Sequence, residues 1–163
     1  MKRTTWMLAA VAKARHVKAL SVQQIKEYLA GADMGYSKPA EIYDFPSPAH
    51  VLKVADEIGL SAEQRRAASE LLEHHKAEAR RIGLRFVDTE RELELLFRSG
   101  NVQPAALASA VRRLARVECS YRLLHLETNR RMRQLLTDEQ VVRYAALRHV
   151  PGCKQATMKG DSQ

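Results

Sequence analysis

An uninterrupted stretch of 39 residues, 61–99, most constrains how this chain can fold. It contains no proline and a single glycine, so nothing inside it forces the backbone to turn. Ser61 and Gln64 form a capping box, which marks a helix start. A helix of this length spans roughly 58 Å and needs a partner of similar length. One line of residues along this helix, its seam, recurs in alternating steps of four and three, which is the period of a helix that lies along other helices. The seam consists of Ala68, Leu72, His75, Ala79, Ile82, Phe86, Thr89, Leu93 and Leu96.

A second stretch, 104–136, repeats this rhythm and has the length to be the partner. Gly100 closes the first helix and Pro104 opens the second, so the connection between them is short. Two helices joined by a short turn lie antiparallel to each other. The seam of the second helix consists of Leu107, Val111, Leu114, Glu118, Tyr121, His125, Thr128, Met132 and Leu135.

Shorter helices flank this pair. Capping residues and stop signals predict helices over 21–31, 48–59 and 137–150, with one helical turn near 40–43. We therefore predict an all-α fold built on a long antiparallel helical hairpin. Four apolar residues of the long helices lie outside both seams: Leu84, Leu95, Leu123 and Leu126. A second subunit packed on the long helices would cover them, so we predict a homodimer.

The ends of the chain differ from its middle. Of a net charge of +8, residues 1–20 carry five positive charges and no negative one. The segment 1–14 has a basic start, an apolar run and small-x-small triplets, which is the layout of a secretory signal peptide; the alternative is a frayed amphipathic N-terminus. We expect one helical-hairpin domain over 17–149 and a disordered tail over 150–163.

Several functional classes find no support. The sequence has no diagnostic nucleophile–base spacing, no glycine-rich phosphate loop and no His-Glu-x-x-His motif, so we expect no enzyme and no required cofactor. Missing RNA-binding aromatics and a nearly neutral middle argue against nucleic acid. No run approaches the roughly 20 apolar residues of a membrane span. Cys119 and Cys153 fit no metal spacing, and the sequence leaves open whether they pair.

Three helix starts share a pattern of leucine, then serine or threonine, then glutamine three residues later. They are LSVQQ at 20–24, LSAEQ at 60–64 and LTDEQ at 136–140. The last two bracket the hairpin, as they do in the LTxxQ family of bacterial periplasmic stress proteins, which includes Spy, CpxP and the zinc-resistance-associated protein. The order of elements over 17–148 also resembles the related periplasmic heavy-metal-resistance proteins, or heavy-metal sensors.

This resemblance implies an exported, periplasmic, non-enzymatic, all-helical dimer that binds metal ions or shields unfolded proteins. Metal-sensing members carry pairs of His or Met four residues apart on facing helices. Here the residue four beyond His125 is Asn129, and the residue four beyond His50 is Val54. Neither pair is complete, so the family's metal site is not carried over whole.

The residues themselves suggest a metal site on the long helices. Glu118, His125 and Met132 are spaced by seven, which places them along one face, and His75 lies about midway along the partner. Such ligands suit Zn²⁺, Ni²⁺, Co²⁺ or copper. Residues seven apart lie about 10.5 Å apart along the axis, so Glu118 and Met132 cannot share one ion. A compact site needs His125, one neighbour and a group from the partner helix, from His50 or from a second subunit.

The alternative to this metal site is structural: a hydrogen-bonded seam histidine, a core methionine and a glutamate paired with an arginine.

Binding of unfolded client proteins is the broader hypothesis. The second long helix carries seven arginines whose stems can cover apolar surface while their heads attract acidic segments: Arg112, Arg113, Arg116, Arg122, Arg130, Arg131 and Arg133. We expect metal binding in heavy-metal resistance first, an ATP-independent chaperone second and a basic cytoplasmic helical adaptor third.

Overall fold

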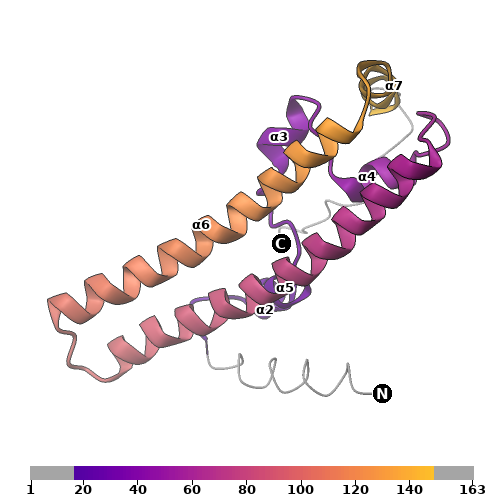
Figure 1. Cartoon of the computed structure of the whole chain (residues 1–163). Coiled ribbons are helices and arrows are strands. Elements are labelled where there is room, and N and C mark those ends of the chain that lie inside the picture. The colour runs from indigo at the N-terminus through magenta and orange to yellow at the C-terminus, as the bar shows by residue number, and fades with distance from the viewer. Residues whose placement is uncertain (1–16, 149–163) are drawn as a thin grey trace, which may run out of the picture.

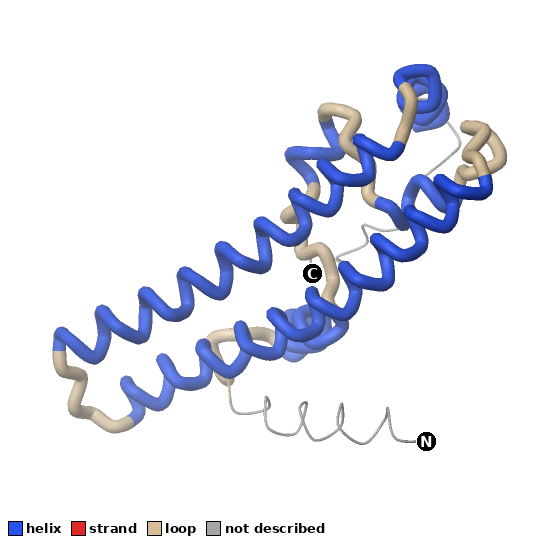
Figure 2. Tube along the Cα trace, viewed as in Figure 1, coloured by secondary structure: helices blue, strands red, loops and turns tan. Residues whose placement is uncertain are grey.

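The computed structural model describes residues 17–148, which form helices and turns and, over that range, no strand (Figures 1 and 2). The all-α prediction is confirmed. The expected signal peptide, 1–14, the tail over 150–163 and Cys153 lie outside the described residues. In chain order the helices are α2 (Val22–Ala30), α3 (Lys38–Ile42), α4 (Pro48–Lys53), α5 (Ala62–Arg98), α6 (Pro104–Leu135) and α7 (Asp138–Arg148).

The two long helices, α5 and α6, pack along each other in opposite directions and are joined by the connection at 99–103 (Figure 1). α5 begins where its capping box predicts, because the Ser61 hydroxyl accepts from the Gln64 N–H at 3.1 Å and the Gln64 side chain accepts from the Ser61 N–H at 3.0 Å. α2 packs on α5, α3 on α6, and α4 on both. No helix within 17–148 is both long and apolar enough to cross a membrane.

The predicted helix over 48–59 is wrong in its length. α4 ends at Lys53, and Val54 leaves the helical region with φ −117° and ψ 27°. Turns then carry the chain to the start of α5. Val51 and Ile58 are nevertheless fully buried, because both pack in the apolar cluster at the end of the long pair where α6 meets α7.

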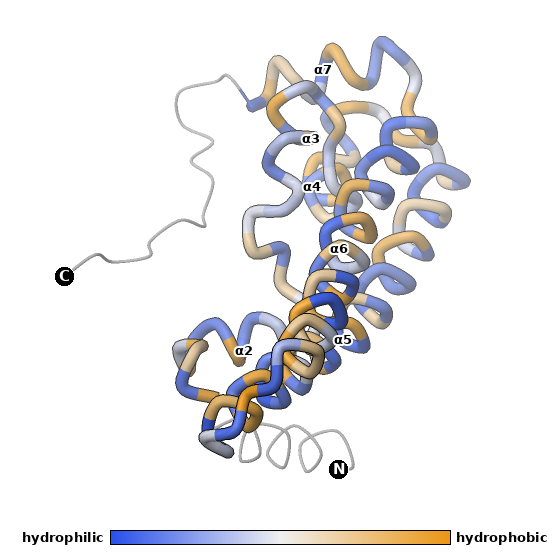
Figure 3. Tube along the Cα trace, turned by 90° about the vertical axis from the view of Figure 1, so that its left-hand side faces the viewer, coloured by the Kyte–Doolittle hydropathy of each residue, from blue (hydrophilic) through white to orange (hydrophobic). Residues whose placement is uncertain are grey.

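The seams are broader than the sequence predicts. Leu71 and Val87 on α5 are buried although they lie beside the expected seam, because α4 and α2 cover a second side of that helix. Val111, an expected seam residue, is 46% exposed. Apolar and polar positions are interspersed along both long helices (Figure 3). Leu84, Leu95 and Leu123 stay exposed, as the sequence predicts, whereas Leu126 is half-buried.

The close contact of α2 with α5 depends on Gly83. A Cβ atom at this position would lie 1.9 Å from the backbone oxygen of Tyr28. The absent side chain lets the α2 backbone lie directly on α5, where the ring of Tyr28 stacks on that of Phe86 with centroids 4.2 Å apart. This contact helps form the first of two apolar clusters, between α2, α5 and α6.

Two capping glutamines join the starts of α5 and α7. The amides of Gln64 and Gln140 donate to each other's oxygens at 2.8 and 2.9 Å. Gln64 also donates to the Leu135 carbonyl, and Gln140 donates to the Gly59 carbonyl. Gln140 additionally accepts from the Thr137 N–H at 3.0 Å. The repeated serine-or-threonine-to-glutamine pattern therefore caps two helices and links them with the same side chains.

We expect Gln140→Leu to lower the free energy of unfolding by about 2–3 kcal/mol, because it leaves several buried donors and acceptors without partners. Gln24→Leu is the matched control: Gln24 occupies the same capping position in α2, but it is exposed and, within residues 17–148, its hydrogen bonds as a cap go to Ser21 alone. We expect Gln24→Leu to lower the free energy of unfolding by less than about 1 kcal/mol. Urea unfolding of both variants measures the difference, and equal losses would contradict the linking role of Gln140.

Candidate metal centre

A belt of buried polar residues crosses the interior of the α5–α6 pair between the two apolar clusters. On α6, Tyr121 belongs to the first cluster and Met132 to the second. His125, Thr128 and Asn129 lie between them and are each at most 4% exposed. Their burial is costly unless their polar atoms find partners.

His125 contacts groups from three directions. Its Nδ1 lies 3.3 Å from the Asp33 carboxylate, which belongs to the turn after α2. Its ring meets that of Tyr121 at a centroid distance of 4.7 Å and that of His75 at 4.6 Å. Its Nε2 is buried and has no hydrogen-bond partner among the described residues. This nitrogen is the unusual feature of the belt, since buried polar atoms are normally paired.

His75 supplies the second imidazole from the facing helix α5. Its Nδ1 lies 2.9 Å from the Thr128 hydroxyl oxygen, and its ring meets the ring of His125 edge-on, at an interplanar angle of 72°. His74, its neighbour in the chain, is exposed. The fold therefore brings His75 and His125 together and leaves His74 outside.

Burial favours the neutral form of both imidazoles of the pair. Burial lowers the pKa of His75 to about 4, with a smaller contribution from His125. Burial also lowers the pKa of His125, and it outweighs the Asp33 carboxylate, which raises that pKa. A neutral imidazole carries one N–H and one lone pair, so each ring has one nitrogen able to bind a metal ion.

The other expected metal ligands lie elsewhere. Met132 is fully buried in the second apolar cluster. His50 is exposed and pairs with Glu41 at 2.9 Å. Glu118 accepts from the Tyr36 hydroxyl at 3.2 Å and lies 3.7 Å from Arg122.

Within 17–148 no group of three or more His, Cys, Asp or Glu side chains is arranged to hold a metal ion. The described chain thus offers a pair of imidazoles rather than a complete metal cage. Two nitrogen donors fit a borderline ion such as Zn²⁺, Ni²⁺, Co²⁺ or Cu²⁺, with further positions left for water or another group.

The turn after α2 holds residues that sequence reasoning missed. Ala32 accepts from the Tyr121 hydroxyl at 2.6 Å, which holds this turn against α6 beside His125. Asp33 also accepts from the Ser37 N–H at 2.8 Å. The ring of Tyr36 lies under the guanidinium of Arg122 at 4.5 Å. These residues follow no regular spacing, so the periodicity of the sequence does not point to them. A local signal does exist for Asp33, because it is a polar residue in the turn that follows the helix stop at Gly31.

Asn129, at the position four residues beyond His125 where the resemblance to the metal-sensing proteins predicts a ligand, makes a structural contact. Its side-chain amide donates to the Phe45 carbonyl at 2.9 Å and is 1% exposed. It therefore fixes the segment before α4 on α6. The Asn129 amide satisfies a backbone group of this chain, which leaves His75 and His125 as the two imidazoles of the belt.

The arginine surface of α6 is partly neutralised. Arg113 lies 3.4 Å from Glu92, Arg130 lies 2.6 Å from Glu127, and Arg133 lies 2.6 Å from Asp138. Arg112 and Arg116 are exposed and make no ion pair within the described part of the chain. Arg131 is exposed as well, and its charge helps lower the pKa of Glu127.

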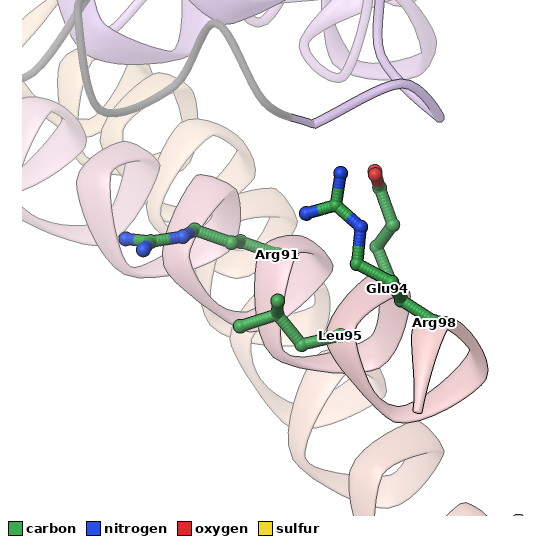
Figure 4. A pocket seen from close by; sticks show the side chains of 4 residues that line it. All are labelled: Arg91, Glu94, Leu95 and Arg98. Carbon is green, nitrogen blue, oxygen red and sulfur yellow. The ribbon is translucent and has the colours of Figure 1, made fainter. Parts of the chain in front are cut away.

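Two surface hollows lie away from the histidine pair. One, of about 200 Å³, is lined by Arg91, Glu94, Leu95 and Arg98 (Figure 4). All four side chains come from α5, so this hollow follows one helix instead of opening between elements. A second, of about 450 Å³, is lined by Lys18, Ala19, Glu90, Leu93, Glu94 and Phe97. Neither is lined by a residue of the polar belt.

No family model matches the sequence, and no curated protein or solved structure is significantly similar to it.

Proposed function

We propose that this protein binds a divalent transition-metal ion through His75 and His125 and serves in heavy-metal resistance, by sensing or by sequestration. The observation that carries the proposal is the buried Nε2 of His125, which has no partner among the described residues although a second imidazole lies beside it. A nitrogen lone pair in this position binds a borderline metal ion well and forms no competing hydrogen bond.

The wider setting belongs to the same proposal. The protein acts in the periplasm after export, performs no catalysis and works as a homodimer of the kind found among the Spy- and CpxP-like stress proteins. Exposed Leu84, Leu95 and Leu123 on the long helices favour the dimer, because association would remove their apolar surface from water. The mass of the protein in solution tests the dimer.

Calorimetric titration of protein without an affinity tag tests the metal proposal with Zn²⁺, Ni²⁺, Co²⁺ and Cu²⁺. We expect dissociation constants in the micromolar range or tighter. We expect at least a tenfold loss of affinity in His75→Gln and in His125→Gln, because each removes one nitrogen ligand. His74→Gln is the matched control and is expected to bind like the wild type, since His74 is exposed beside the pair. Undiminished binding in His75→Gln or His125→Gln, or no binding by the wild type, would overturn the proposal.

A second candidate function is ATP-independent binding of unfolded proteins on the outer face of α6. The observation in its favour is the exposure of Val111 (46%) and Leu123 (62%) on the same helix as Arg112 and Arg116, which make no ion pair with any residue of 17–148. Apolar surface beside arginine stems can hold partly unfolded, acidic segments weakly. If the wild type binds no metal, suppression of aggregation of an unfolded client, compared between wild type and Leu123→Ser, becomes the deciding assay.

A further inference from the structure

The hydrogen bonds of His75 fix which of its nitrogens carries the proton. The Thr128 hydroxyl has one hydrogen, and it donates this hydrogen to the Leu124 carbonyl at 2.8 Å. Towards His75 the same oxygen can therefore act as an acceptor only. The Nδ1 atom of His75, 2.9 Å away, must be the donor, which leaves the lone pair on Nε2.

A carboxylate oxygen close to Nδ1, in an ion-pair contact, leads to the same tautomer at His125. The Asp33 carboxylate has no hydrogen to donate, and its Oδ1 lies 3.3 Å from the His125 Nδ1. That oxygen is held in place by the Ser37 backbone N–H at 2.8 Å and by the Ser37 hydroxyl. Nδ1 of His125 is thus the protonated nitrogen, and the lone pair lies on Nε2, the atom that is buried with no partner.

We infer that Asp33 and Thr128 are positioning residues, which hold the two facing imidazoles as Nδ1–H tautomers so that both Nε2 lone pairs are available to one metal ion. The metal-binding part of this inference rests on the proposed function. Histidine ligands in metal sites are oriented in this way, because an oxygen acceptor on one nitrogen fixes the tautomer and makes the other nitrogen a better ligand.

The arrangement also defines the class of ion. Asp33 is occupied by His125 and Ser37, so the centre presents nitrogen lone pairs rather than a set of oxygens. Zn²⁺, Ni²⁺, Co²⁺ and Cu²⁺ accept imidazole ligands, whereas Mg²⁺ and Ca²⁺ require several oxygen ligands. We therefore expect the pair to bind the first group and not the second.

Long-range ¹H–¹⁵N NMR of the metal-free protein reads the tautomers directly at neutral pH. In the wild type we expect the Nδ1–H form at both His75 and His125. Thr128→Val removes the acceptor for His75 and should shift that ring towards the Nε2–H form, whereas Thr128→Ser keeps the hydroxyl and should not. Asp33→Ala should shift His125 in the same way, whereas Asp33→Asn keeps an acceptor oxygen and should preserve the wild-type tautomer.

Zn²⁺ titration of the same proteins tests the consequence for binding. We expect Thr128→Val and Asp33→Ala to lose 10- to 100-fold in affinity, and Thr128→Ser and Asp33→Asn to stay within a few fold of the wild type. Nε2–H tautomers in the wild type would overturn the inference whatever the metal does. Unchanged affinity despite altered tautomers would overturn the positioning role. Nδ1–H tautomers in a wild type that binds no Zn²⁺ would support the tautomer assignment and overturn the proposed function.

Discussion

Gly83→Ala is expected to lower the free energy of unfolding by about 3 kcal/mol and to loosen α2 from α5. The added Cβ would lie 1.9 Å from the Tyr28 oxygen and 2.7 Å from its carbonyl carbon. Both are backbone atoms, so no side-chain rotation relieves the clash and α2 has to move as a unit. Helix propensity acts in the opposite direction, since alanine is favoured over glycine inside a helix by about 1 kcal/mol. The overpacking cost of a well-packed interface outweighs it.

Urea unfolding measures the loss, and amide hydrogen exchange of α2 shows where it occurs. Gly100→Ala is the matched control. It makes the same substitution at φ +70°, where a Cβ would meet nothing within 4 Å. Its backbone strain is expected to cost about 1 kcal/mol and to leave exchange in α2 unchanged. A stabilised Gly83→Ala variant with normal protection of α2 would show that α2 does not lie against α5 as closely as in this structure.

The histidine pair makes the fold sensitive to mild acid. The folded pKa of His75 is about 4, whereas an unfolded histidine titrates near 6.5. Below pH 6.5 the unfolded chain therefore binds the proton more readily than the folded chain does. The stability that the neutral ring contributes is complete above about pH 6.5 and is lost as the pH falls from there towards 4. A fall of the pKa from 6.5 to about 4 corresponds to roughly 3 kcal/mol.

His125 acts in the same direction, because its pKa is lowered as well. Urea unfolding at pH 7.5 and at pH 5 measures the combined loss. His75→Gln does not titrate at this position, so its stability should fall by about 1–2 kcal/mol less than that of the wild type over this range. His74→Gln changes an exposed neighbour and should keep the full loss. A wild type equally stable at both pH values would contradict the burial of neutral rings.

Local signals in the sequence are sufficient to predict the helices. The capping box of Ser61 and Gln64, the absence of proline over 61–99 and the stop at Gly100 all act within a few residues, and α5 has the expected bounds to within one residue. The reason is that capping and periodicity depend on neighbours three or four positions apart. Where the local signal is weaker, as at Val54, the predicted helix over 48–59 is too long.

The candidate site is predictable in part. Seam periodicity places His75 and His125 on the inner faces of facing helices, and the structure puts their rings 4.6 Å apart. The same periodicity does not separate them from Met132, which is an apolar core residue here. Periodicity tells which side of a helix faces inward, but it does not tell which neighbours a side chain meets there.

The sequence by itself determined the helix types, their starts and the inward faces of the long pair, because each of these follows from short-range backbone and side-chain preferences. Tertiary structure alone decided the contacts that give the site its chemistry. Asp33 reaches His125 across 92 positions of the chain, and Gly83 acquires its importance from the Tyr28 carbonyl that rests on it. Such contacts arise when α2 and the turn after it pack on the long helices, and that packing is set by how surfaces from distant segments fit together.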